Sequence, residues 1–194
     1  MNTTGKQLDD FVARDEDLAE RARRGSGAAF GALVTRHRNG VYVIARNMCA
    51  TLREAEAVLQ QAFLAAWRDL RSFPAGAKFT TWLYGIAMKT ALAHRRDLPS
   101  PPGSLEPFLP AFDGASRLIA SKNRRPEWGG VESSGLLREA LECTDDQTRA
   151  AFVLCDLLEL PVEEAAAILQ TSPGAVRRDT HRLRLMLRGF IDGL

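Results

Sequence analysis

A proline- and glycine-rich segment, residues 98–134, divides a chain whose other parts are patterned as α-helices. It contains the strings PSPPG, EPFLP and RRPEWGG. A long stretch without regular pattern is uncommon inside one compact domain but is expected between two domains. No run of alternating β-branched residues occurs on either side of it. The sequence therefore predicts an all-α protein with two small helical domains, residues 1–97 and 135–194, joined by a linker over 98–134.

Apolar residues that recur every three or four positions define the expected helices. Before the linker they cover about 15–24, 28–48, 52–70 and 79–96. After it they cover about 136–143, 146–158, a helix opened by Pro161, and 173–188, and one helical turn is expected near 117–122 in the linker itself. Thr51 and Glu54 fit a capping box at the start of the third helix. The expected buried face of that helix consists of Ala55, Val58, Leu59, Ala62, Phe63, Ala66 and Trp67.

The last two helices are patterned as a helix-turn-helix. The helix PVEEAAAILQ is followed by a short turn at 170–172, after which Ser172 is the expected N-cap and Pro173 the first helical residue. Small residues at the start of the second helix would let its tip approach a DNA groove, and its arginines can reach base edges or phosphates. The competing interpretation is a basic surface helix in solvent. The candidate DNA contacts are Ser172, Pro173, Gly174, Ala175, Arg177, Arg178, His181 and Arg182.

The segment KFTTWLYGIAMKTALAHRR mixes aromatic, hydroxyl and basic residues within one expected helix. Trp82 and Tyr84 are two positions apart, so they leave the helix about 200° apart and cannot share one buried stripe. Aromatic side chains stack on unpaired bases, and basic residues hold the backbone of a single strand. The segment is therefore a candidate for binding single-stranded DNA. The alternative is that Phe79, Trp82, Leu83 and Ile86 are simply core residues.

Basic residues are concentrated in two places, although the net charge is only +2. Residues 25–97 contain ten basic and four acidic residues, and residues 177–188 contain five arginines and one aspartate. Two basic surfaces on a nearly neutral chain favour a polyanionic partner such as DNA.

Several classes of function are disfavoured by what the sequence lacks. Its three cysteines form no C-x-x-C pair, and its three histidines match no zinc spacing, so we expect neither a metal nor a cofactor. There is no phosphate-binding glycine loop or nucleophile elbow, and Glu163 and Glu164 are expected on an exposed helix face, so an enzyme is not expected. No apolar run reaches the roughly 18 residues of a membrane span, and no signal peptide is apparent, so we expect a cytoplasmic protein.

Two long segments resemble a known family. LREAEAVLQQAFLAAWRDLRSFPAGAKFTTWLYGIAMKTALAHRR is similar to region 2 of an extracytoplasmic-function (ECF) sigma factor. ALECTDDQTRAAFVLCDLLELPVEEAAAILQTSPGAVRRDTHRLRLML is similar to region 4 of the same family. The resemblance implies a factor that binds core RNA polymerase, directs it to particular promoters in transcription initiation, and is held inactive by a separate anti-sigma factor.

The resemblance also implies roles for particular residues. Helix 173–187 would enter the major groove of the −35 element, and the linker would run toward the RNA exit channel. Helix 52–70 would dock on core polymerase through Glu56, Gln60, Gln61 and Arg68. The loop 72–78 and helix 79–96 would open the −10 element through Ser72, Phe73, Lys78, Thr80, Thr81, Trp82, Tyr84, Lys89 and Arg95.

Some positions depart from the family pattern. Ala57 and Gln61 stand where acidic residues are usual, and Asp179 stands where a basic residue is frequent. Gly85 and Met88 replace common arginines, Thr180 a usually apolar residue, and Gln170 the common turn glycine. These departures keep open an alternative, a DNA-binding regulator derived from a sigma factor with weakened polymerase binding.

Overall fold

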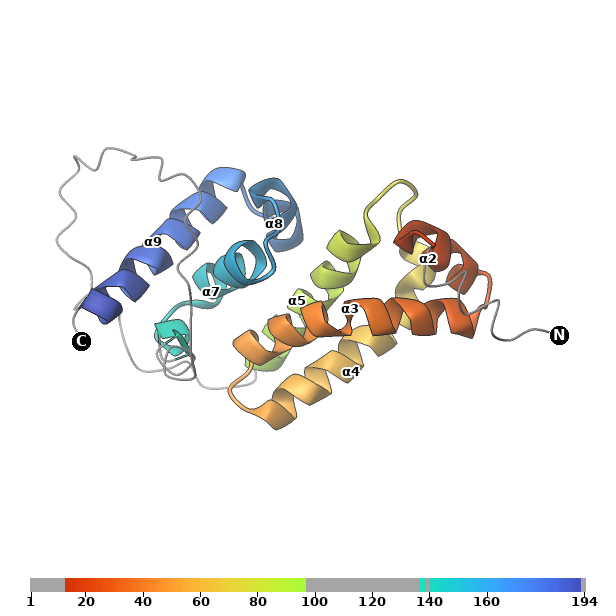
Figure 1. Ribbon diagram of the computed structural model, residues 1–194, viewed down its shortest axis with the longest axis horizontal. Coiled ribbons are helices and arrows are strands. Elements are labelled where there is room, and N and C mark those ends of the chain that lie inside the picture. The colour runs from red at the N-terminus through yellow and green to blue at the C-terminus, as the bar shows by residue number, and fades with distance from the viewer. Residues whose placement is uncertain (1–12, 97–136, 139, 193–194) are drawn as a thin grey trace.

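The computed structural model describes residues 13–96, 137–138 and 140–192, and every regular element within them is helical. Figure 1 shows two groups of helices. We call α2 to α5 the N-terminal bundle, and α7 to α9 with the short helix η3 the C-terminal bundle. The prediction of an all-α fold is confirmed. The expected linker, with its turn near 117–122, lies outside the described residues.

The N-terminal bundle is organised around one long helix. Helices α2 (Asp15–Arg23), α4 (Leu52–Asp69) and α5 (Phe79–Arg96) all contact α3 (Gly27–Met48), and α4 also packs on α5. Leu33, Val41 and Ile44 of α3 are completely buried, as their helical spacing predicts. The bundle therefore holds α4 and α5 against a common core, with their other faces available for contacts.

Local signals fix where these helices begin and end. Gly25 adopts a left-handed φ of +97° after α2, a conformation that glycine reaches without steric cost. The capping box predicted for α4 is present: the Glu54 amide donates to the Thr51 hydroxyl, and the Thr51 amide donates to the Glu54 carboxylate, both at 3.2 Å. α4 then continues into a single 3₁₀ turn, η1 (Leu70–Ser72).

The C-terminal bundle contains α7 (Asp146–Phe152), η3 (Val153–Leu157), α8 (Val162–Leu169) and α9 (Pro173–Asp192). One continuous α-helix was expected over 146–158, but its second half is a π-helical turn. There the Leu158 amide donates to the carbonyl of Val153, five residues earlier, at 3.0 Å. Arg149 of α7 is only 2% exposed and donates to the Leu141 carbonyl. Burial lowers the pKa of Arg149 to about 10.

The two bundles pack against each other. Helix α5 contacts α8, and α3 contacts both α7 and η3. Ala150, Ala165 and Val176 of the C-terminal bundle belong to the same buried apolar cluster as the core of the N-terminal bundle. Two domains were expected from the sequence, but nothing in it predicted this shared core.

Candidate nucleic-acid interface

Helices α8 and α9 form the helix-turn-helix that the sequence predicts. Gln170 ends α8 with a left-handed φ of +52°, so a non-glycine residue takes the turn position where the family commonly has glycine. The Ser172 hydroxyl accepts a hydrogen bond from the Ala175 amide at 3.1 Å, which is the predicted N-cap. α9 begins at Pro173. The turn chemistry therefore presents the first turns of α9 outward.

One face of α9 is buried and the other is accessible. Val176, Thr180 and Leu183 are buried against the C-terminal bundle. The Thr180 hydroxyl donates to the Val176 carbonyl at 2.9 Å, which explains how a polar residue occupies a usually apolar position. The opposite face places the predicted −35 residues together, with Ser172, Gly174, Arg177, Arg178, His181 and Arg182 exposed and Pro173 and Ala175 partly exposed.

Acidic side chains lie beside the arginines of this face. Arg177 pairs with Glu163 of α8 at 2.8 Å, and both side chains are well exposed. Asp179 is partly buried, and desolvation raises the pKa of its carboxyl while the positive charge of Arg178 opposes the rise. The basic face is therefore partly neutralised before any DNA is present.

The candidate −10 residues lie at the start of α5 and in the loop before it. Phe73 of the loop packs on Phe79 and Trp82, with ring centroids 5.7 and 5.4 Å apart respectively. Phe79 is buried, whereas Phe73 and Trp82 remain partly exposed. This cluster supports the loop and leaves part of the Trp82 ring at the surface. Ser72 and Lys78 before α5 are exposed, Thr80 and Thr81 in its first turn are partly exposed, and Lys89 is exposed farther along the helix.

Tyr84 is a correction to the predicted set. Its side chain is only 8% exposed and packs against Gly40 of α3, where a Cβ atom would overlap the Tyr84 hydroxyl. Burial is also the main cause of the raised pKa of Tyr84. Trp82 and Tyr84 were expected to point in different directions, and it is Tyr84 that lies inside the bundle. Tyr84 is therefore not an accessible DNA contact.

Three other predicted −10 residues are engaged by the C-terminal bundle. The Thr81 hydroxyl donates to the Glu164 carboxylate at 2.8 Å, and the Lys78 ammonium pairs with the same carboxylate. Arg95 donates to Asp146 at 2.5 Å and to the Met48 carbonyl at 3.1 Å. Glu164 was expected on an exposed face, but its side chain is only 20% exposed because α5 covers it.

Helix α4 carries the candidate polymerase-binding face. Glu56, Gln60, Gln61 and Arg68 are all exposed, as predicted. Three large apolar side chains of the same helix are also exposed: Leu52 is 56%, Leu64 is 68% and Trp67 is 42% exposed. The sequence analysis did not identify Leu64 as a candidate contact residue, because it resembles any other apolar residue of an amphipathic helix. Trp67 was expected to be buried but is 42% exposed, and its ring packs on that of Phe30 with ring centroids 4.8 Å apart.

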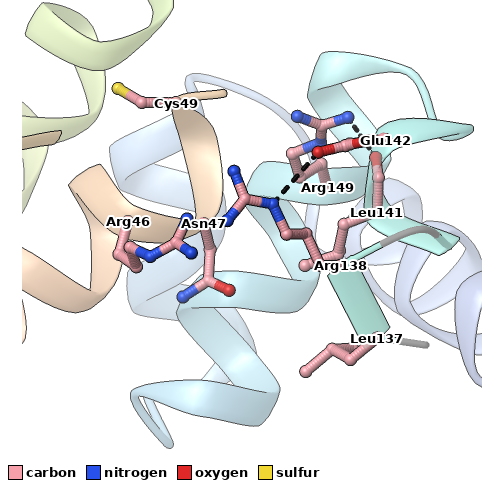
Figure 2. A pocket seen from close by; sticks show the side chains of 8 residues that line it. All are labelled: Arg46, Asn47, Cys49, Leu137, Arg138, Leu141, Glu142 and Arg149. Atoms are coloured by element: carbon pink, nitrogen blue, oxygen red, sulfur yellow. Dashed lines mark hydrogen bonds and ion pairs between the residues drawn. The ribbon is translucent and has the colours of Figure 1, made fainter. Parts of the chain in front are cut away.

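A cavity of about 390 Å³ lies where the end of α3 meets the beginning of the C-terminal bundle. Figure 2 shows its side chains, among them Arg46, Arg138 and Arg149. Arg138 pairs with Glu142 at 3.1 Å and donates to the Ala50 carbonyl of the other bundle. Arg138 thus joins the two bundles, and none of these three arginines belongs to the predicted DNA surfaces.

Neither a metal site nor a membrane-spanning helix is present within the described part of the chain. No group of three or more histidine, cysteine or acidic side chains could hold a metal ion there. None of the helices there is long and apolar enough to cross a bilayer.

Comparisons with known proteins agree with this architecture. Residues 33–98 match the family model for sigma-70 region 2, and residues 134–187 match that for sigma-70 region 4. The chain is 30% identical to the RNA polymerase sigma-H factor of Pseudomonas aeruginosa, over 88% of this chain and 90% of that protein. It is 31% identical to the ECF RNA polymerase sigma-E factor of Escherichia coli K12, again over 88% of this chain and 90% of that protein.

Solved structures resemble the whole arrangement of helices. The structure of CnrH, in complex with the cytosolic domain of CnrY, matches with a TM-score of 0.65 and 25% identity over 92% of this chain and 97% of CnrH. The sigma factor RpoE of Bartonella quintana, in complex with the anti-sigma factor NepR, matches in fold with a TM-score of 0.64 and 20% identity, covering 84% and 96% of the two chains. Because regions 2 and 4 match in order on the two bundles, and relatives at 30–31% identity cover most of the chain, the protein belongs to the extracytoplasmic-function family of sigma-70 factors.

Proposed function

We propose that this protein is an initiation factor that directs core RNA polymerase to specific promoters. The observation that carries the proposal is the ordered match to regions 2 and 4, on two bundles that each expose a basic, candidate DNA-binding surface. The relatives at 30–31% identity are named as RNA polymerase sigma factors. The chemistry of RNA synthesis would belong to the polymerase, and the chain itself would have no catalytic role.

The −35 element would be bound by α9 in the major groove. Its exposed face, which includes Arg177, Arg178 and Arg182, offers guanidinium groups for base edges and phosphates. The first turn of α9, whose Ala175 amide is capped by the Ser172 hydroxyl, would face the DNA backbone, where the positive end of the helix dipole favours phosphate.

The −10 element would be bound as a single strand along the beginning of α5. Trp82 would stack on an extruded base, and Lys78 and Thr81 would hold neighbouring phosphates. The aromatic cluster with Phe73 and Phe79 supports this proposal, because it keeps the Trp82 ring in place before any DNA arrives.

Core polymerase would be bound by the exposed face of α4. The polar residues Glu56, Gln60, Gln61 and Arg68 surround the exposed Leu64, an arrangement that fits the apolar centre and polar rim of a protein interface. The alternative, a regulator with weakened polymerase binding, rested on Ala57 and Gln61, and none of the relatives favours it. Co-purification with core polymerase separates the two: a chain that never co-purifies would be the regulator.

A separate inhibitory partner is also part of the proposal. CnrH, which is 25% identical, has a solved structure in complex with the cytosolic domain of CnrY. We propose that this chain likewise binds an anti-sigma factor that covers its bundles.

Run-off transcription on a library of genomic fragments tests the proposed function. Core polymerase supplemented with the chain should give discrete transcripts whose upstream sequences share two spaced motifs, while core alone should give none of them. An Arg178→Ala variant should lose most of these transcripts and remain folded by circular dichroism. Fragments transcribed equally with and without the chain would refute the proposal.

A further inference from the structure

The aromatic cluster at the start of α5 rests on a histidine of α3. The His37 ring packs on the ring of Phe79, with ring centroids 5.6 Å apart. Phe79 in turn contacts Phe73 and Trp82, each with its ring centroid 5.7 Å away. His37 and Phe79 are buried, whereas Phe73 and Trp82 are partly exposed. The exposed part of the cluster therefore lies on a buried layer, and His37 is the polar member of that layer.

A carboxylate of α2 fixes the orientation of the His37 ring. Asp15 is the first residue of α2, and its Oδ2 lies 2.7 Å from Nε2 of His37. An ionised carboxylate only accepts hydrogen bonds, so the ring donates through Nε2. The side chains of Asp15 and His37 are only 18% and 9% exposed, and a charge-assisted hydrogen bond is stronger in such surroundings than in water. Rotation of the His37 ring is therefore unfavourable while Asp15 stays in place.

Asp15 is itself held by a second basic side chain and by the packing of α2. Arg36 of α3 pairs with its other oxygen, Oδ1, and also donates to the Ala13 carbonyl at 3.0 Å, just before α2. Helix α2 contacts α5 and η1, the two elements that flank the loop before α5 (Figure 1). Leu18 of α2 is completely buried in the same apolar cluster as Phe79. The beginning of α2 is therefore fixed in relation to that loop.

The proposed role of Trp82 requires its ring to be in place before a base is extruded. A side chain that must be immobilised on binding reduces affinity, whereas one held in advance by packing does not. Trp82 is partly exposed, and its packing on Phe73 and Phe79 holds its ring. Phe79 is the buried member of these three, and it packs on the ring of His37. A hydrogen bond made beneath the cluster can thus determine the orientation of the ring at the surface.

We propose that Asp15 and His37 are positioning residues for the −10 interaction: their hydrogen bond fixes the ring on which Phe79 packs, and through Phe79 it keeps Trp82 oriented for the extruded base. The inference rests on the proposed function for the role of Trp82. Neither residue would touch DNA. They are 22 positions apart on different helices, and no local pattern in the sequence marks such a pair.

Four variants of the full-length chain separate this role from general destabilisation. Asp15→Ala removes the acceptor, and His37→Gln keeps a side-chain N–H donor but removes the ring. Asp15→Asn keeps an oxygen that can accept from Nε2 but loses the charge that pairs with Arg36. Asp17→Ala is the matched control, because Asp17 also lies in the first turn of α2 and pairs with Arg14 at the surface. If Asp15→Ala unfolds the chain, the comparison of His37→Gln with Asp15→Asn takes its place.

The first measurement is fluorine NMR of the free chain labelled with 5-fluorotryptophan. Trp82→Phe identifies the Trp82 resonance, and Trp67, which packs on Phe30, is the internal reference. Asp15→Ala and His37→Gln should shift and broaden the Trp82 resonance and leave that of Trp67 in place, whereas Asp15→Asn and Asp17→Ala should keep the wild-type Trp82 resonance. The inference is overturned if Asp15→Ala or His37→Gln leaves the Trp82 resonance unchanged, if Asp15→Asn moves it as far, or if the Trp67 resonance moves equally.

The second measurement is promoter opening by the holoenzyme, on a promoter found in the run-off experiment. Asp15→Ala should slow opening about three- to tenfold while binding in the closed complex changes little. In a chain that already carries Trp82→Ala, the same change should have no further effect, because no ring remains to be positioned. Losses that add in the double variant would refute the inference. If the wild-type chain gives no run-off transcript, the proposed function fails, and the fluorine spectra still show whether Asp15 and His37 orient Trp82.

Discussion

Arg177 and Arg178 are sequence neighbours on α9, but their surroundings differ. Arg177 is paired with Glu163 at 2.8 Å. A DNA phosphate or base would therefore have to displace the Glu163 carboxylate before it could bind Arg177. Arg178 has as its neighbour Asp179, whose carboxyl is partly desolvated and has a raised pKa. An aspartate in that position can accept from a cytosine amino group but repels phosphate. The DNA sequence that α9 prefers therefore depends on which of the side chains of Arg177, Arg178 and Asp179 contacts a base.

We expect Arg178→Ala to weaken binding of the preferred −35 duplex by about 1–3 kcal/mol if the guanidinium reads a base edge. Fluorescence anisotropy on a set of single-base variants of that duplex measures this. The preference at one base position should disappear in the variant. Arg184→Ala is the control, because Arg184 pairs with Asp156 within the C-terminal bundle. A uniform loss on every duplex would place Arg178 on phosphate.

The three cysteines should differ in their reactivity toward alkylating reagents. Cys143 is exposed, whereas burial raises the pKa of Cys49 and of Cys155 to about 11. Compared with an ordinary thiol, this leaves roughly a hundredfold less thiolate at neutral pH, and the thiolate is the reactive form. Brief treatment with N-ethylmaleimide at pH 7, followed by peptide mass spectrometry, should find Cys143 modified first. Equal labelling of Cys155 would mean that the C-terminal bundle opens readily.

At the scale of the element, most helix boundaries could be predicted because their signals are local. The Thr51–Glu54 capping box and the Ser172 N-cap depend on residues three apart, and both are present. Burial on a particular face was less predictable. Tyr84 is inside because Gly40 on another helix leaves room for it, and Trp67 is exposed because α4 turns that edge away from the core. Such outcomes depend on neighbours that are distant in sequence.

Gly40 gives a direct test of that long-range contact. We expect Gly40→Ala to lower the free energy of unfolding by about 1–3 kcal/mol, because the new methyl group would collide with Tyr84. Gly31→Ala is the matched control on the same helix: nothing lies within 4 Å of its Cβ position. That change should raise the free energy of unfolding by about 0.5–1 kcal/mol. Urea unfolding followed by circular dichroism measures both, and equal effects would contradict the packing described for Tyr84.

At the scale of the whole molecule, the sequence predicted the two bundles but not how they meet. The division at 98–134 indicated separate domains, and the helical periods located the cores. The contact of Glu164 with Lys78 and Thr81 joins residues more than eighty positions apart, and no local pattern marks such a pair. Glu164 was expected in solvent for the same reason: within α8 alone it lies on the polar face.

Promoter opening tests Trp82 in the complete complex with core polymerase. We expect Trp82→Ala to slow opening about five- to 150-fold while closed-complex binding at low temperature changes little, because a stacked base contributes about 1–3 kcal/mol only after the strands separate. Permanganate reactivity of unpaired thymines measures opening, and filter binding measures the closed complex. Trp82 also packs on Phe73 and Phe79, at 5.4 and 5.7 Å, so its loss could act through the fold. Trp82→Tyr separates the two explanations: an aromatic ring of similar shape should restore opening. Equal losses at both steps, with no recovery in Trp82→Tyr, would make Trp82 a structural residue of the loop.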